Sequence, residues 1–364
     1  MHPPAGSGAG GAGGSGGASG TGGAPTVSWV TGEDHARLLR DFRGERTGFV
    51  RISHKGYFFP SKFATDMKHF TDFKPRPADT WIVTYPRSGT TWTQEMIWLI
   101  ANDLDFDKAR AVPLAERFPF FEFSGFFHDE VTNEFLEHNA GHPERQEIVR
   151  SMAVPGYRAF ADLPDKRFIK THLPLSLLND DLLDCGAKVV YLARNPKDVA
   201  VSFFHLNRSI LTQGYIGDFE GYWNYFQNDM HHWTPYWSHL EEAWQLRDHP
   251  RLLFMFYEDM RKDYPAAIRR VADFLGKQLT PEQMAALSEH LDIANFRKNP
   301  AVNSECLYDL GIMRREEHAF IREGQVGGWG GYFTPELEAQ ADEWIAKNLA
   351  KTDMRFPNYS NQQG

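Results

Sequence analysis

The sequence predicts an α/β protein in which helices flank a central parallel sheet. Apolar runs of strand length occupy residues 80–84, 188–193 and 251–257, and stretches of helical pattern separate them, as expected for successive βαβ units. The chain has 364 residues, of which 41% are hydrophobic, enough for one large domain with a generous core. No linker-like stretch follows residue 30, so we expect a single domain over residues 26–364.

The chain opens with a Gly/Ser-rich stretch that is not expected to fold. Residues 1–25 contain eleven of the 31 glycines and no charged side chain, so they have little apolar surface to bury and much backbone entropy to lose. We predict a disordered tail over residues 1–25, with order beginning between about residues 27 and 35. The apolar residues 57–60 are then expected to pack against the domain ahead of its first strand.

A strand, a loop and a helix form the most informative stretch of the chain. The strand at residues 80–84 runs into a turn marked by Pro86 and Gly89, and a helical pattern begins at about residue 90. Such a loop directs unpaired backbone N–H groups and the positive end of the helix dipole at one point, which suits a phosphate. Four loop side chains add hydrogen-bond donors: Arg87, Ser88, Thr90 and Thr91.

Two other interpretations of this loop remain open from its residues alone. The loop departs from the nucleotide-binding pattern G-x-x-x-x-G-K-[ST], because no Lys precedes Thr90 and no Gly stands five residues before Gly89. An ordinary ATP or GTP site is therefore not expected. The stretch could also be a plain strand, turn and helix in which a Ser or Thr caps the helix.

Composition excludes several classes of function. The net charge of −9 argues against a general nucleic-acid-binding protein, whose surface carries a broad positive field. The two cysteines, Cys185 and Cys306, cannot form a disulfide framework and suit a reducing compartment. The sequence has no apolar run long enough to span a membrane and no pattern of a secretory signal. We therefore expect a cytoplasmic protein.

Aromatic residues crowd the stretch at residues 117–123. It contains four Phe and one Pro, and neither helical nor strand periodicity explains it. These side chains could pack in the core. Alternatively, they could form an apolar wall for a flat or greasy ligand.

A polar triplet stands at the end of a brief strand at residues 167–174. Lys170 and His172 are two residues apart, so they project from the same side of a regular strand. Open parallel sheets bind ligands at the carboxyl ends of their strands. A lone His is often structural, but a Lys donor and a titratable imidazole facing one crevice indicate a functional site.

The apolar run at residues 188–193 ends at a second candidate anion site. Asn195 can cap the helix that follows, and Pro196 can occupy its first position. Arg194 then lies at the carboxyl end of a strand, beside a helix N-terminus. It could bind an anion there, or it could be an ordinary surface charge.

The remaining stretches predict mainly packing. Helices are expected at residues 130–137, twice within 219–247, and at 265–275, 281–291 and 334–349. His231 and His232 are adjacent and lack a further ligand nearby, so no metal site is expected. The Gly-rich stretch at residues 320–331 could be a surface loop or a lid over a ligand.

Taken together, the motifs resemble those of the cytosolic sulfotransferases that use 3′-phosphoadenosine 5′-phosphosulfate. The resemblance covers residues 57–350, and its specificity lies in the order of several separate motifs. These are residues 85–92, 170–174, 191–202, 256–260, 298–300 and the run Arg322-Glu323-Gly324 with Gly327 and Trp329.

The resemblance also implies roles for individual residues. The loop from Arg87 to Thr91 would wrap the 5′-phosphosulfate, Trp92 would lie near the adenine, and Tyr257 would contact the base. The 3′-phosphate would be held by Arg194, Ser202 and Arg322, with Glu323 and Gly324 beside it. His172 would be the catalytic base, Lys170 would support the transferring group, and Phe120 and Phe123 would gate the acceptor pocket. The resemblance implies no metal.

Three departures from the family pattern stand out. Arg87 replaces a usual Lys, which exchanges a compact ammonium for a planar guanidinium. Glu323 replaces a Lys beside the 3′-phosphate, which favours repulsion. A dimerisation motif of the form K-x-x-x-T-V-x-x-x-E is degenerate around Thr334, so we expect a monomer or an atypical dimer.

The resemblance implies transfer of a sulfuryl group to a hydroxyl of a small, largely apolar acceptor such as a phenol or sterol. A same-fold dehydratase that acts through a sulfated alcohol is an alternative. So is a catalytically silent module that binds a nucleotide or a lipophile. A nucleotide kinase is a further alternative, but the Lys of its phosphate loop is missing.

Overall fold

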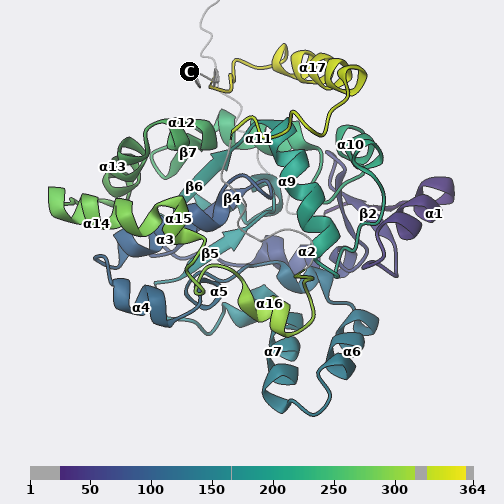
Figure 1. Cartoon of the computed structure of the whole chain (residues 1–364), viewed down its shortest axis with the longest axis horizontal. Helices are drawn as coiled ribbons and strands as arrows, with labels where there is room; N and C mark the ends of the chain where they lie inside the picture. The colour runs from purple at the N-terminus through teal and green to yellow at the C-terminus, as the bar shows by residue number, and fades with distance from the viewer. Residues whose placement is uncertain (1–24, 165, 316–325, 358–364) are drawn as a thin grey trace, which may run out of the picture.

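A four-stranded parallel sheet forms the centre of the computed structural model, which describes residues 25–164, 166–315 and 326–357 (Figure 1). Its strands are β4 (Thr80–Thr84), β5 (Phe168–Thr171), β6 (Lys188–Ala193) and β7 (Leu252–Phe256), in the order β5-β4-β6-β7. The predicted α/β fold class is confirmed. The predicted tail at residues 1–25 lies almost wholly outside the described residues, so the boundary at residue 26 stays a prediction.

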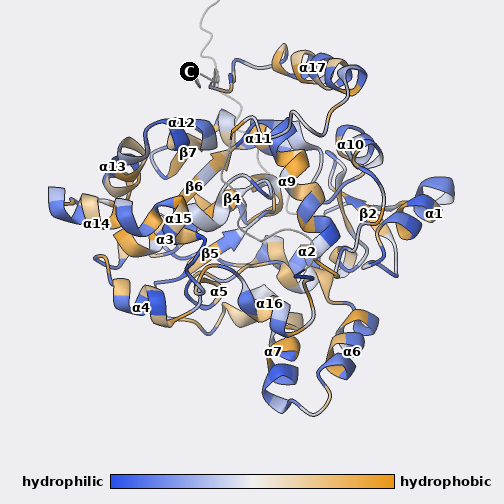
Figure 2. Ribbon diagram, in the orientation of Figure 1, coloured by the Kyte–Doolittle hydropathy of each residue, from blue (hydrophilic) through white to orange (hydrophobic). Residues whose placement is uncertain are grey.

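Helices cover both faces of this sheet, because its strands are buried almost continuously and present apolar side chains to both faces. Ile82 and Val190 pack with α3 (Thr90–Ala101), α13 (Tyr264–Leu275) and α14 (Pro281–Leu291). Trp81 and Val189 belong to the core on the other face, which includes α9 (Pro196–Ser209), α10 (Phe219–Gln227) and α11 (Tyr236–Gln245). Figure 2 shows both apolar and polar residues on these helices, and α3 and α9 are buried over almost their whole length.

The remaining helices surround this centre. They are α1 (Gly32–Asp41), α2 (Phe63–Asp72), α4 (Phe106–Ala111), α5 (Leu114–Arg117), η1 (Phe123–Phe126), α6 (Asp129–His138), α7 (Pro143–Ala153), α8 (Gly156–Ala159), η2 (Leu175–Leu177), η3 (Asp180–Leu182), α12 (Tyr257–Lys262), α15 (Ile293–Phe296), α16 (Glu305–Asp309) and α17 (Pro335–Leu349). All predicted helices are present within two residues of their expected ends. In the described ranges, no helix is both long and apolar enough to cross a bilayer.

A second, smaller sheet was not predicted. It is antiparallel and consists of β1 (Val27–Trp29), β2 (Phe49–Ile52) and β3 (Tyr57–Pro60), in that order. The residues of β3 are buried, as expected for a segment that packs on the domain. That this segment forms a strand was not predicted. Strands of three or four residues are too short to show a reliable alternation in the sequence.

The connection of the main sheet explains where a site can form. β4 pairs with β5 on one side and with β6 on the other, so the chain places successive strands on opposite sides of β4. The pairs Val83–Thr171, Thr84–Leu192 and Ala193–Phe256 bring the carboxyl ends of the four strands level. An open parallel sheet has its ligand crevice at such a switch of strand order.

A buried ion pair joins the opposite, amino ends of β4 and β5. Arg167 donates from Nε and Nη2 to the two carboxylate oxygens of Asp79, at 2.7 and 2.6 Å, and both side chains are almost fully buried. The guanidinium also donates to the carbonyl groups of Phe160 and Lys74. This pair therefore has the geometry and the additional hydrogen bonds that a buried ion pair requires.

Asp79→Ala is expected to lower the free energy of unfolding by about 3–5 kcal/mol, because it leaves the Arg167 charge buried without its partner. Chemical denaturation measures this change. Asp72→Ala is the matched control, since it removes an exposed ion pair with Lys68 and should change stability by less than about 0.5 kcal/mol. Equal losses in the two variants would contradict the assignment.

Candidate active site

The loop between β4 and α3 adopts a conformation that depends on Gly89. Gly89 is the N-cap residue of α3, has a φ of 99°, and no side chain caps the helix. A Cβ atom at Gly89 would lie 2.6 Å from Cδ2 of Tyr257, so glycine is needed for both its backbone angle and its packing. The alternative of a helix capped by Ser or Thr is therefore wrong.

Two hydroxyl groups of the loop are buried and differ in their partners. The Ser88 hydroxyl has no hydrogen-bond partner among the described residues, although the residue is fully buried. Thr90 Oγ1 lies 2.8 Å from Thr84 Oγ1, which links the helix to the strand before it. An unpaired buried hydroxyl beside an uncapped helix N-terminus fits a site for a phosphate or sulfate group.

Arg87, Ser202 and Arg194 form one connected cluster, as the prediction of two neighbouring anion sites requires. Arg87 donates from Nε to Ser202 Oγ at 3.0 Å, and its carbonyl accepts from Arg194 Nη1 at 2.9 Å. The Arg194 guanidinium lies 4.4 Å from the centre of the Tyr257 ring. Because Arg194 is only 9% exposed, the alternative of an ordinary surface charge is wrong.

The helix after Arg194 begins as predicted. The Asn195 side chain accepts a hydrogen bond from the backbone N–H of Lys197, and Pro196 occupies the first turn of α9. The backbone N–H of Asn195 donates to the buried Glu258 carboxylate at 2.7 Å. Glu258 therefore fixes the turn that presents Arg194 and the start of α9.

Trp92 lies at the start of α3 and lines the same cavity as the loop. Its indole N–H donates to the Leu291 carbonyl at 2.8 Å, and its ring stacks on Tyr264 with centroids 4.7 Å apart. Tyr257 meets the Trp92 ring edge on, at 6.5 Å. These contacts form an aromatic surface near the loop, and the role of Trp92 toward adenine stays a prediction.

His172 lies directly after β5, with its ring held in one tautomer. Nδ1 lies 2.8 Å from the Thr84 carbonyl oxygen, which can only accept, so Nδ1 carries the proton and Nε2 keeps a free lone pair. Burial lowers the pKa of His172 well below its ordinary value, and the neighbouring Lys170 ammonium lowers it further. The imidazole is therefore neutral and able to accept a proton at neutral pH.

Lys170 points into the same cavity as His172. Its ammonium nitrogen lies 4.3 Å from the centre of the Phe120 ring. Burial lowers the pKa of Lys170 to about 8, and the nearby Arg87 acts in the same direction, whereas the Glu122 carboxylate raises it. The expected juxtaposition of a Lys donor and an imidazole is confirmed.

Glu122 is the main residue of the site that sequence reasoning missed. Its carboxylate is fully buried and accepts from the Thr171 hydroxyl and from the backbone N–H of His172, both at 2.7 Å. Burial raises the pKa of Glu122 to about 7, although both hydrogen bonds favour the ionised form. A lone Glu within an aromatic run was the available signal, because Glu is almost never buried without partners.

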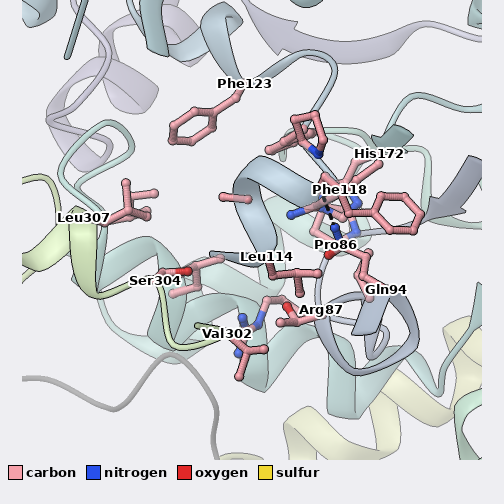
Figure 3. Close-up of a pocket in the computed structure, with 18 of the residues that line it drawn as sticks. Pro86, Arg87, Gln94, Leu114, Phe118, Phe123, His172, Val302, Ser304 and Leu307 are labelled. Atoms are coloured by element: carbon pink, nitrogen blue, oxygen red, sulfur yellow. Dashed lines mark hydrogen bonds between the residues drawn. The ribbon is translucent and has the colours of Figure 1, made fainter. Parts of the chain in front are cut away.

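A cavity of about 840 Å³ is lined by the loop, by Lys170 and His172, and by an apolar wall (Figure 3). Phe120 and Phe123 line it and stack with centroids 5.7 Å apart, while Phe121 is part of the core. Both interpretations of the aromatic stretch therefore apply, to different residues. Further apolar lining comes from several elements: Phe118, Phe126, Ile148, Met152, Val302 and Leu307.

Some predicted residues fall outside this description. Arg322, Glu323 and Gly324 lie outside the described residues, so their predicted roles are untested. His231 and His232 are buried side by side among aromatic rings. In the described part of the chain, no three His, Cys, Asp or Glu side chains are grouped as metal ligands would be.

Comparison with known proteins agrees with this geometry. The family model of the sulfotransferase domain matches residues 77–353. Luciferin sulfotransferase of Photinus pyralis is 36% identical over 283 residues, which are 76% of this chain and 73% of that protein. Sulfotransferase 1A1 of Bos taurus is 31% identical over 302 residues, which are 83% of this chain and 94% of that protein.

Solved structures give the same result. Retinol dehydratase in complex with androsterone and the inactive cofactor PAP superposes with a TM-score of 0.86 at 38% identity, over 92% of this chain and 98% of that chain. A complex of retinol dehydratase with retinol and PAP has the same TM-score and identity, over 92% and 99% of the two chains. The match in sequence and in fold confirms what the ordered motifs predicted: the chain belongs to the sulfotransferase family.

Proposed function

We propose that the protein transfers a sulfuryl group from 3′-phosphoadenosine 5′-phosphosulfate to a hydroxyl of a small, largely apolar acceptor, with His172 as the general base. The observation that carries this proposal is the shared cavity, which is lined by the anion-binding loop, by His172 and by an aromatic wall. The family membership and the relatives solved with PAP support the sulfate donor.

The chemistry requires one bond to form, one bond to break and one proton to move. The acceptor oxygen forms a bond to sulfur as the bond from sulfur to the 5′-phosphate oxygen breaks, and the acceptor proton goes to His172 Nε2. The protein has to position the partners in line and stabilise charge on the leaving phosphate. Arg87 and Lys170 supply positive charge at this point, and the Thr84 carbonyl keeps Nε2 of His172 available.

Arg87, which stands where the family usually has Lys, contacts two residues assigned to the 3′-phosphate. Arg87 Nε donates to Ser202 Oγ, and the Arg87 carbonyl accepts from Arg194 Nη1. A lysine ammonium lacks the planar set of donors that lets one side chain hold Ser202 and face the loop as well. We propose that Arg87 couples the sites for the two phosphate groups.

The dimer motif of the family is replaced by a helix start. Thr334 caps α17 by accepting from the Leu337 backbone N–H, and Pro335 occupies the first turn. We therefore keep the proposal of a monomer or an atypical dimer. Cys185 and Cys306 are free thiols, which agrees with the proposed cytoplasmic location.

Dehydration is a second candidate, favoured by the 38% identity to retinol dehydratase. In that reaction an allylic sulfate ester loses its C–O bond and a proton, which leaves an alkene and sulfate. Both reactions need the donor site and the base, so the products must decide. A silent binding module is disfavoured, because it would not need Glu122 to hold the His172 backbone in place.

His172→Ala is expected to lower kcat by about 10²- to 10⁴-fold, since it removes the proton acceptor. Transfer from labelled sulfate donor to a panel of phenols, sterols and allylic alcohols measures the change, with mass analysis separating sulfate esters from alkenes. His142→Ala is the control, because this His is exposed and outside the cavity lining. Unchanged turnover in His172→Ala would refute the assigned base.

Arg194→Ala is expected to weaken binding of 3′,5′-adenosine bisphosphate by about 10- to 100-fold, because it removes charge-assisted hydrogen bonds to the 3′-phosphate. Calorimetric titration without Mg²⁺ measures this loss. Adenosine 5′-monophosphate is the matched ligand, and its affinity should change much less. Equal losses for the two nucleotides would show that Arg194 does not act on the 3′-phosphate.

Glu122→Gln is expected to move the alkaline limb of the kcat profile to lower pH. Glu122 is ionised above about pH 7, so its charge is present where Lys170, with a pKa of about 8, loses its proton. The Glu122 carboxylate raises the pKa of Lys170, so its removal lowers that pKa. On the alkaline side, each pKa unit changes the protonated fraction of Lys170 about tenfold. Rates measured from pH 6 to 10 test this.

Glu144→Gln is the control for Glu122→Gln, because it makes the same change at an exposed carboxylate outside the cavity lining. It should leave both kcat and the pH of the alkaline limb in place. The same limb in Glu122→Gln and wild type would contradict an electrostatic role for Glu122.

A further inference from the structure

His172 is held by its backbone as well as by its ring. Its backbone N–H donates to Glu122, and its ring Nδ1 donates to the Thr84 carbonyl. Its backbone carbonyl lies 2.9 Å from Nε2 of His239, a fully buried residue of α11. Each polar atom of His172 other than Nε2 therefore has a buried partner. The sequence motifs assign no role to His239.

The contact with His172 fixes the tautomer of His239. The His172 carbonyl can only accept, so Nε2 of His239 carries a proton. Burial lowers the pKa of His239, although the hydrogen bond to His172 and the Glu242 carboxylate act in the opposite direction. The neutral ring then has an acceptor at Nδ1. The Tyr191 hydroxyl on β6 lies 2.7 Å from this Nδ1 and donates to it.

The helix that carries His239 is also fixed to the segment after His172. Glu242, three residues further along α11, accepts from the Ser176 backbone N–H at 2.9 Å and from the Ser176 hydroxyl at 2.7 Å. The same carboxylate accepts from the Tyr57 hydroxyl of β3 at 2.6 Å. α11 and the small antiparallel sheet therefore support the segment from His172 to Ser176 from behind.

His239 does not reach the cavity itself. His172 is among the residues that line the cavity, and His239 is not. The His239 ring packs against Tyr85 and Tyr191, with ring centroids 5.7 and 5.8 Å apart. His239 can therefore act on the reaction only through another residue, and His172 is the cavity residue to which it donates.

The hydrogen bond from His239 bears directly on the direction of the base. A buried carbonyl that loses its donor costs free energy, so the peptide group after His172 would turn to find another partner. The imidazole would turn with it. A proton is transferred only when Nε2 lies within hydrogen-bond reach of the acceptor hydroxyl, and a misplacement of about 1 Å can cost about 10²-fold in rate.

We infer that His239 is a positioning residue for the general base: by donating from Nε2 to the His172 carbonyl, it fixes the direction in which His172 Nε2 faces the acceptor hydroxyl. The inference rests on the proposed function, which assigns the base to His172. It gives His239 no contact with the donor, the acceptor or the transferred group.

Two variants and one control isolate this hydrogen bond. His239→Leu removes the donor and should lower kcat by about 10- to 100-fold, with the acceptor KM and the bisphosphate affinity unchanged. His239→Gln places an amide N–H near the position of Nε2 and should recover most of this loss. His128→Leu is the control, because it makes the same change at a buried His outside the cavity lining, whose ring nitrogens have no hydrogen-bond partner within the described ranges.

The acidity of the acceptor separates a misplaced base from a general loss of structure. A phenol that is ionised at the assay pH needs no base, whereas an aliphatic alcohol needs one. His239→Leu should therefore lower transfer to the alcohol far more than transfer to the ionised phenol, and His172→Ala should show the same pattern. Equal losses on the two acceptors would contradict a role through the base.

A double-mutant cycle tests whether His239 acts through His172. In the His172→Ala background, His239→Leu should cause almost no further loss of kcat, since the base that it positions is already gone. Losses that multiply would overturn the inference. Thermal unfolding and bisphosphate affinity check that each variant is folded.

A measurement without turnover separates this inference from the proposed function. In protein with isotope-labelled histidine, the Nδ1–H signal of His172 is identified by its absence in His172→Ala. This proton should exchange with water faster in His239→Leu than in the wild type, and unchanged exchange overturns the inference. Faster exchange in a protein whose turnover survives His172→Ala would support the placement by His239 and refute the proposed function. A large loss of kcat in His172→Ala with none in His239→Leu would refute the inference alone.

Discussion

The parallel pairing of four strands is the constraint on which the site depends. Because β4, β5, β6 and β7 run in the same direction and in level register, their carboxyl ends meet at one edge. Each strand is followed within one or two residues by a part of the site: the loop at Pro86, then His172, Arg194 and Tyr257. Pro86 and Tyr257, which are 171 positions apart in the sequence, are thereby placed around one cavity.

Two buried carboxylates hold the carboxyl ends of β5 and β6 in place. Glu122 accepts the backbone N–H of His172, and Glu258 accepts that of Asn195, both at 2.7 Å. Burial raises the pKa of each to about 7, so each is costly to ionise and depends on its hydrogen bonds. The chain carries a net charge of −9, yet these acidic groups serve to orient a site whose functional charges are positive.

Sequence reasoning succeeded where local chemistry decides the structure. The strand before the loop, the turn at Gly89, and the cap at Asn195 all follow from residues within one short segment. It failed for the small antiparallel sheet and for Glu122. The role of Glu122 arises from Thr171 and His172, which are 49 and 50 residues away in the sequence, and periodicity and turn signals do not encode such partners.

Backbone pairing also makes the two walls of the cavity differ in how freely their backbone can shift. Backbone hydrogen bonds join the segment of Phe120 to β5. The Lys170 backbone N–H donates to the Pro119 carbonyl, and the Phe121 backbone N–H donates to the Lys170 carbonyl. A backbone shift on this wall would also displace β5, which carries Lys170 and ends just before His172. The opposite wall, on α7 and α16, is free of this tie. Substitutions on α7 and α16 could thus change which acceptors the cavity admits while the reaction stays the same.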